Sequence, residues 1–231
     1  SATNLAGIDF TNNDQVRYTA TSTLNDVFTS AKFRDAGGGW YHIVFAVDVT
    51  QGTNANKVKI YVNGVQVTRF GATNYPSDSN QTINDTVEHL IGKRTNASEY
   101  FDGYMSQVYL IDGQQLDASY FGFTDPLTNT WRPKKYEGTF GTNGFYLPMD
   151  NQDNFEKDKS GNGHNFSKNN FSGTSSNPDV VKDSPSGVLF GGPPTTGITT
   201  TSSGPANYCT FNFQDKDGGI TLSNGNLTLD H

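Results

Sequence analysis

Residues 57–68, KVKIYVNGVQVT, decide the fold class. Polar and apolar residues alternate from Lys57 to Val62, which is the pattern of a strand with one buried face. Asn63 and Gly64 follow, and this pair favours a type I′ turn because both central positions of that turn need a positive φ. Residues 65–68 return as a second strand. The stretch therefore predicts a β-hairpin.

The flanking sequence adds further strands to this hairpin. Residues 40–48, WYHIVFAVD, make a hydrophobic strand with partial alternation, and residues 104–112, YMSQVYLID, alternate more regularly. Residues 116–122 predict one helical turn with Asp117 as its N-cap. Shorter strands are expected at residues 16–19, 29–33, 89–92, 143–149, 209–213 and 219–229.

The composition of the whole chain favours strands and turns over helices. Its 231 residues include 25 Gly, 16 Phe and 11 Tyr, while glutamate, a good helix former, is scarce. No run approaches the ~20 apolar residues of a membrane helix, so we expect no membrane insertion. The net charge is −7 and the basic residues are scattered, so no nucleic-acid partner is expected. Cys209 is the single cysteine, which excludes an intrachain disulfide framework.

Turn-forming residues near 124–133 predict a boundary between two parts of the chain. We expect residues 1–125 to form an all-β domain and residues 126–231 to form a turn- and loop-rich β extension. Within the extension, residues 173–206 are rich in Ser, Thr, Gly and Pro, which indicates a long extended segment.

Five short motifs give residues 40–122 a family resemblance. They are WYHIV at 40–44, KIYVNG at 59–64, IG at 91–92, YFDGYMSQV at 100–108 and LDASYF at 116–121. Together they resemble the laminin-G-like branch of the concanavalin A-like jelly rolls. The resemblance implies an all-β jelly-roll sandwich for residues 1–125 that lacks the first strands of the family. Such a sandwich has an uncovered edge or core face, which residues 1–39, the 145–230 region or a neighbouring subunit would cover.

The later part of the chain resembles tail-fibre and other virion surface proteins of marine tailed phages. The motifs that carry this likeness are FYLP at 145–148, DKSGNGHNF at 158–166, DSP at 183–185, NYCTFN at 207–212 and LSNGNL at 222–227. The likeness implies an extracellular position on the virion surface, with host cell-surface polysaccharide and other virion proteins as partners. It also implies a homo-oligomer, for which a trimer is usual in phage fibres, and a chain that is the middle piece of a longer protein.

The sequence offers no pattern for catalysis. Relatives of this fold include glucanases, and a retaining glycosidase needs two carboxylates about 5–5.5 Å apart. The glutamates are isolated, and the nearest acidic alternation, Asp215 and Asp217, lies in a turn. Neither a Gly-x-Ser-x-Gly elbow nor a His-x-x-x-His spacing occurs. We therefore expect a protein that is not an enzyme.

Glycan binding needs only an exposed aromatic ring and a few polar groups that bind hydroxyls. Two loops offer this combination, and the candidate residues are Asn74, Tyr75, Asn96, Glu99 and Tyr100. The family resemblance also implies calcium as a cofactor, held by hard oxygen ligands. The candidate ligands are Asp35 and Asp102, although the Asp102-Gly103 pair is first of all explained as turn chemistry.

Three functions remain open at this point. The first is a non-enzymatic virion surface module for host attachment, which binds glycans weakly at each site and gains strength through avidity. The second is a purely structural protein of a capsid or fibre, whose Thr-, Gly- and Pro-rich segments wrap around neighbouring subunits. The third is a glycan depolymerase, which the missing carboxylate pattern disfavours.

Overall fold

The computed structural model describes residues 6–20, 26–34, 39–77, 83–94, 99–150, 153–171, 173, 179 and 180, and the backbone of 221–223 and 228–230. Its contacts divide the chain into two units. The first comprises Ser1–Tyr104 and Leu110–Gly144, and the second comprises Met105–Tyr109 and Phe145–His231. Residues 126–144, which the sequence assigns to the extension, therefore pack with the first unit.

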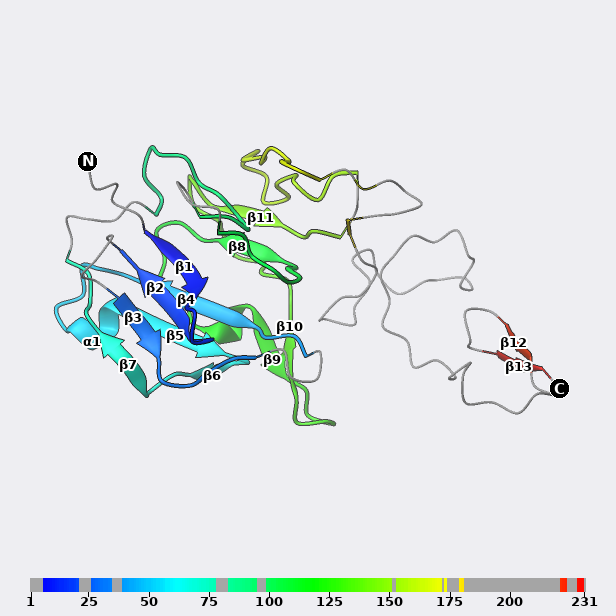
Figure 1. Ribbon diagram of the computed structural model, residues 1–231, viewed down its shortest axis with the longest axis horizontal. Coiled ribbons are helices and arrows are strands. Elements are labelled where there is room, and N and C mark those ends of the chain that lie inside the picture. The colour runs from blue at the N-terminus through cyan, green and yellow to red at the C-terminus, as the bar shows by residue number, and fades with distance from the viewer. Residues whose placement is uncertain are drawn as a thin grey trace. The chain divides into compact units, whose positions relative to one another are not determined.

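The two larger sheets of the first unit are both antiparallel (Figure 1). One sheet has the order β1-β2-β3-β7, with strands at Gly7–Phe10, Val16–Thr19, Asp26–Thr29 and Phe70–Thr73. The other has the order β4-β5-β6, with strands at Ile43–Val47, Val58–Val62 and Val65–Gln66. Helix α1, Asn54–Lys57, is a single turn before β5. The expectation of an all-β fold is confirmed.

The core of the first unit lies between these two sheets. Val16 and Tyr18 on β2, Val27 on β3, and Val58 and Ile60 on β5 are all buried in one cluster. The two residues from β2 and the two from β5 are each spaced two apart, so they lie on one face of their strand. The two sheets thus bury one face each against the other, as in a β-sandwich.

The predicted hairpin is confirmed at the turn between β5 and β6. Asn63 has a φ of 48° and Gly64 a φ of 80°, the two positive values that a type I′ turn requires. Val62 lies opposite Val65 across the turn. The turn is local in origin, since it depends on two adjacent residues.

The outer face of the β4-β5 pair carries a second, smaller cluster. Ala46, Tyr61 and Ala118 are buried there, and Val44 and Trp131 pack against them. Ala118 begins η1, Ala118–Tyr120, whose predicted cap is also confirmed: the Asp117 carboxylate accepts a hydrogen bond from the Ser119 N–H at 2.8 Å. The short strands β9, Gly122–Thr124, and β10, Trp131–Pro133, then pair with each other.

In the second unit, β8, Val108–Leu110, pairs with β11, Phe145–Leu147. The ring of Tyr146 stacks on Tyr109 with centroids 4.3 Å apart. Asp158 accepts hydrogen bonds from the backbone N–H groups of Tyr146 and His164, both at 2.9 Å, so its carboxylate ties the turn-rich segment to β11. Strands β12, Thr221–Ser223, and β13, Thr228–Asp230, form an antiparallel pair.

Several expected strands differ from those observed. Residues 89–92 form no strand, and the strand expected at 104–112 is reduced to Val108–Leu110. The weak pattern at 29–33 belongs to a strand that ends earlier, at Thr29. Residues 209–213 lie outside the described residues. Among the residues described, no helix has the length and apolar character needed to cross a bilayer.

Candidate functional site

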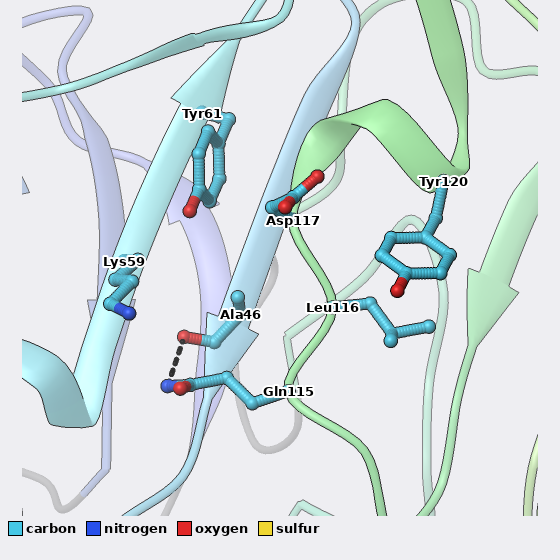
Figure 2. A pocket seen from close by; sticks show the side chains of 7 residues that line it. All are labelled: Ala46, Lys59, Tyr61, Gln115, Leu116, Asp117 and Tyr120. Atoms are coloured by element: carbon cyan, nitrogen blue, oxygen red, sulfur yellow. Dashed lines mark hydrogen bonds between the residues drawn. The ribbon is translucent and has the colours of Figure 1, made fainter.

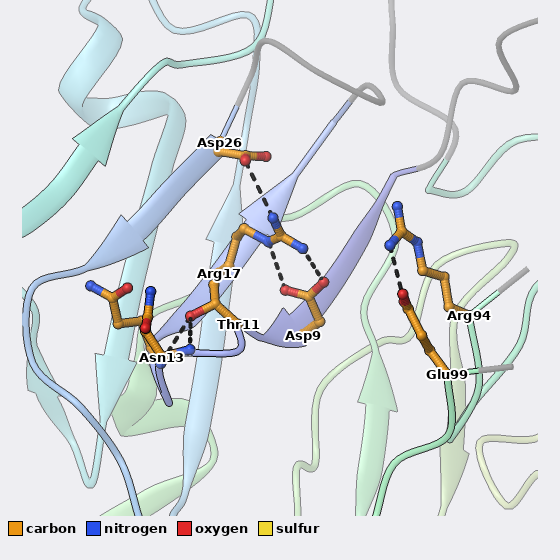
Figure 3. Close-up of polar contacts among 8 residues, drawn as sticks. Asp9, Thr11, Asn13, Arg17, Asp26, Arg94 and Glu99 are labelled. Carbon is orange, nitrogen blue, oxygen red and sulfur yellow. Dashed lines mark hydrogen bonds and ion pairs between the residues drawn. The ribbon is translucent and has the colours of Figure 1, made fainter. Parts of the chain in front are cut away.

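A hollow of about 500 Å³ lies at the β1 edge of the first sheet. Strands β1 and β2 and the turn between them supply one wall, from Asp9, Phe10, Thr11, Asn12 and Arg17. The loop before Phe101 supplies the other wall, from Arg94 and Glu99. We call this feature the arginine hollow. Figure 3 shows its polar side chains.

The antiparallel register places opposite charges side by side on one wall. Asp9 lies directly opposite Arg17 in the β1-β2 pairing. The guanidinium of Arg17 donates to both carboxylate oxygens of Asp9, at 2.8 Å from Nε and 2.6 Å from Nη2. Nη1 lies 3.4 Å from Asp26 on the neighbouring strand β3 (Figure 3). The hydrogen bond to Asp9 is the main reason why the pKa of Arg17 is raised above its ordinary value.

The turn between β1 and β2 brings two more polar residues to the hollow. Thr11 N–H donates to the Gln15 carbonyl at 2.8 Å, and Thr11 Oγ1 accepts from the N–H groups of Asn13 and Gln15, each at 3.3 Å. Asp14 adopts a φ of 63°, a conformation that aspartate tolerates better than most residues. This compact turn fixes the backbone of Thr11 and Asn12 at the rim of the hollow.

The second wall consists of two short segments that run antiparallel, one that includes Lys93 and Arg94 and one that includes Glu99 and Tyr100. The Arg94 N–H donates to the Glu99 carbonyl at 3.1 Å, and Lys93 and Tyr100 form an isolated β-bridge. The side chains of Arg94 and Glu99 are also joined, at 3.0 Å, by an exposed ion pair. Glu99 is thereby held facing the hollow by both its backbone and its carboxylate. Tyr100, the next residue, is 61% exposed, and Lys93 Nζ lies 5.5 Å from its ring centroid.

Aromatic surface lies next to these charges. The rings of Phe10 and Phe101 have centroids 6.4 Å apart, and both side chains are partly exposed. The hollow therefore combines an exposed aromatic surface with hydrogen-bonding groups that ion pairs hold in place. An arrangement of this kind can bind a ligand that has apolar faces and many hydroxyl groups.

The structure separates the predicted glycan-binding residues into two places. Glu99 lines the arginine hollow and Tyr100 follows it, whereas Asn96 lies outside the described residues. Tyr75 packs against the core between the sheets. Asn74 is exposed at the end of β7, where its N–H donates to the Asp26 carbonyl at 3.0 Å. Asn74 and Tyr75 are not among the residues that line the hollow.

The predicted calcium ligands are not brought together. Asp102 is exposed in the loop after Tyr100, and Asp35 lies outside the described residues. In the described part of the chain, no group of three or more His, Cys, Asp or Glu side chains is placed to hold a metal ion. The charged side chains that line the arginine hollow are instead matched, two arginines with two carboxylates.

Sequence reasoning missed Asp9, Asn12, Arg17 and Arg94. Asp9 and Arg17 each lie between two apolar or aromatic residues, in IDF at 8–10 and VRY at 16–18. This alternation is a signal that both side chains lie on the face opposite the core. Their pairing depends on the β1-β2 register, however, which the sequence pattern did not provide.

One comparison with known proteins gives a match. The family model for laminin-G-like domains, described as the concanavalin A-like lectin/glucanases superfamily, matches residues 2–118, just over half of the chain. No curated protein and no solved structure matches the chain. The matched region includes both sheets of the sandwich and every residue of the arginine hollow. The chain therefore belongs to the concanavalin A-like lectin/glucanases superfamily.

Proposed function

We propose that the first unit binds a polysaccharide at the arginine hollow without cleaving it. The observation that carries this proposal is the position of exposed aromatic side chains beside ion-paired arginine and carboxylate groups. Figure 3 shows the ion pairs. Planar charged side chains can each bind two neighbouring hydroxyls, while a flat ring packs against the C–H face of a sugar. Membership of a superfamily that includes lectins supports this assignment.

The ion pairs favour binding because they fix the polar groups before a ligand arrives. Arg17 is held by Asp9 and Asp26, so its guanidinium has little rotamer freedom to lose. A binding site that is ordered in advance loses less entropy when the ligand is bound. The volume of about 500 Å³ is within the usual ~300–1,000 Å³ range of small-molecule pockets.

The same contacts support a function without catalysis. A glycosidase needs one carboxyl group that carries a proton to the leaving oxygen. The two carboxylates of the hollow, Asp9 and Glu99, each accept a hydrogen bond from an arginine side chain. Neither is placed as a proton donor, so we propose that the chain is not an enzyme.

The biological setting that we propose follows from the resemblance of the later chain to phage virion surface proteins. In this setting the protein lies on the virion surface and attaches to host cell-surface polysaccharide. It is a homo-oligomer, with a trimer as the expected form, and it contacts other virion proteins. Repeated weak sites on an oligomer then bind one polymer chain with high avidity.

A second candidate function is a purely structural role in a virion or fibre. The observation that favours it is the exposure of four aromatic side chains, Phe10, Tyr100, Phe101 and Tyr104. Contacts between copies of the chain would bury such side chains. The two functions are separated by the response of Phe10 and Tyr104 variants, because only Phe10 lines the hollow.

The test is retention of the full chain on immobilised host-envelope polysaccharides, together with an assay for new reducing ends. We expect the chain to be retained on the polysaccharide and to produce no new reducing ends. Phe10→Ala, which removes the exposed aromatic ring that lines the hollow, and Arg94→Gln should each weaken retention about tenfold, or ~1.4 kcal/mol. The matched control is Tyr104→Ala, which removes a tyrosine that is 70% exposed but does not line the hollow.

Each result has a definite meaning. New reducing ends would overturn the non-enzymatic proposal. Absence of retention by the assembled wild-type oligomer would overturn glycan binding, and dissociation of that oligomer by Tyr104→Ala would then support the structural role. Repeating the retention assay with a chelator tests calcium, because a calcium-dependent site loses its ligand when the ion is removed.

A further inference from the structure

A second hollow, of about 210 Å³, lies on the outer face of the β4-β5-β6 sheet (Figure 2). Ala46 on β4, with Lys59 and Tyr61 on β5, form one side. Gln115, Leu116, Asp117 and Tyr120, before and within η1, form the other. We call this feature the tyrosine hollow. It shares no lining residue with the arginine hollow.

Hydrogen bonds hold the two sides of the tyrosine hollow together. Gln115 Nε2 donates to the carbonyl of Ala46 at 3.3 Å (Figure 2) and to that of Asn56 at 2.7 Å. These bonds tie the segment before η1 to the β4-β5 pair. Asp117 Oδ1 accepts from Ser119 N–H at 2.8 Å and from Ser119 Oγ at 2.6 Å. Neither interaction uses Gln115 Oε1 or Asp117 Oδ2, and both of these oxygens can accept a hydrogen bond.

The rings of Tyr61 and Tyr120 lie on either side of Asp117 (Figure 2). Tyr61 is only 9% exposed and packs in the small cluster with Ala46 and Ala118, so it is a rigid wall. Tyr120 is 50% exposed and forms an accessible rim. Burial, followed by the charge of Asp117, raises the pKa of the Tyr61 hydroxyl, which therefore stays protonated and can donate as well as accept.

The size and charge of the hollow restrict the ligand. A volume of about 210 Å³ is below the ~300–1,000 Å³ of sites for drug-sized molecules, so one small ring is the limit. Lys59 and Asp117 supply one positive and one negative charge, which cancel. A matched pair favours an uncharged ligand, because an anion would meet Asp117 and a cation would meet Lys59.

We propose that the tyrosine hollow is a second binding site, which takes one uncharged pyranose residue. It extends the glycan binding proposed above but does not depend on the arginine hollow. The arginine hollow is built on the sheet that contains β1 and β2, whereas the tyrosine hollow lies on the outer face of the other sheet. The two sites therefore bind separate stretches of polysaccharide.

The test is an NMR titration. The full chain carries ¹³C labels on its Ala and Leu methyl groups, and the titrants are the methyl glycosides of glucose, galactose and mannose. Ala46 and Leu116 line only this hollow, so saturable shifts of their methyl signals report on it directly. We expect shifts with at least one of these glycosides. Tyr120→Ala should weaken the binding about tenfold, because it removes the exposed ring. Phe10→Ala, at the arginine hollow, should leave the shifts unchanged.

The outcomes separate the two sites. Retention on polysaccharide that Phe10→Ala weakens, without any glycoside shift at Ala46 and Leu116, would overturn the tyrosine hollow and leave the first proposal intact. Shifts in the absence of polysaccharide retention would support the tyrosine hollow alone. Shifts with glucuronate but with none of the uncharged glycosides would overturn the assignment of ligand class. The wild-type titration decides the matter even if Tyr120→Ala fails to fold.

Discussion

At the scale of single residues, His42 makes stability depend on pH. Trp131 Nε1 donates a hydrogen bond to His42 Nδ1 at 3.1 Å, which requires a neutral imidazole with its proton on Nε2. Burial lowers the pKa of His42 below its ordinary value of 6.5. The unfolded chain therefore binds this proton more readily than the folded one. The contribution of His42 to stability is present above pH 6.5 and is lost as the pH falls from there through the folded pKa.

We expect the free energy of unfolding to fall below pH 6.5, with a slope of at most about 1.4 kcal/mol per pH unit from this group. Urea unfolding followed by Trp131 fluorescence in a Trp40→Phe background measures it, since the chain has two tryptophans. His42→Gln provides the matched control, because its side-chain oxygen can accept from Trp131 but does not titrate. An equal slope in both variants between pH 6.5 and 5 would show that His42 is not the group responsible.

At the scale of elements, two glycines with similar backbone conformations make a matched pair. Gly64 in the hairpin turn has a φ of 80°, and an added Cβ would collide with the Trp131 indole. Gly113 has a φ of 79° and open space at the same position. Gly113→Ala should therefore lower the free energy of unfolding only by the cost of a positive φ at a residue with a Cβ, about 1–2 kcal/mol. Gly64→Ala should lower the free energy of unfolding further, because the Trp131 indole that covers the turn must also move.

Thermal unfolding of the two glycine variants gives this comparison directly. The larger fall in Tm should belong to Gly64→Ala, accompanied by a change in Trp131 emission that Gly113→Ala does not produce. Equal losses of Tm would mean that the indole adapts to the methyl group at no cost. The pair thus separates the requirement for a positive φ from the close approach of a neighbouring side chain.

Elements with a clear local pattern were predictable from the sequence, whereas strands with a weak pattern, which depend on distant partners, were not. The type I′ turn at Asn63 and Gly64 and the Asp117 cap each follow from the local chain. Strand β7 was missed because Gly71 weakens a strand pattern. In the fold this glycine is needed, since the Phe28 ring of β3 occupies the place where a Cβ would lie.

At the scale of the whole molecule, the candidate site was predictable only in part. The exposed aromatic and acidic residues of one loop, Tyr100 and Glu99, were recognised from their types alone. Arg17 and Asp9 become part of a site only because the register of β1 and β2 places them opposite each other. Tyr75 has the composition of a sugar-binding residue but packs on the core, a distinction that requires the three-dimensional structure.

The net charge of the whole chain predicts how salt affects binding. The formal charge is −7, whereas each hollow is lined by equal numbers of positive and negative side chains. An uncharged polysaccharide should therefore be retained equally at low and high salt. An acidic polysaccharide meets the long-range repulsion of the chain, which is screened over ~10 Å at 0.1 M salt, so its retention should be weaker at low salt and improve as salt is added. The opposite trend would be tighter retention of the acidic polysaccharide at low salt, lost in Arg94→Gln. It would show that the arginines bind negatively charged groups and that the ligand is an acidic glycan.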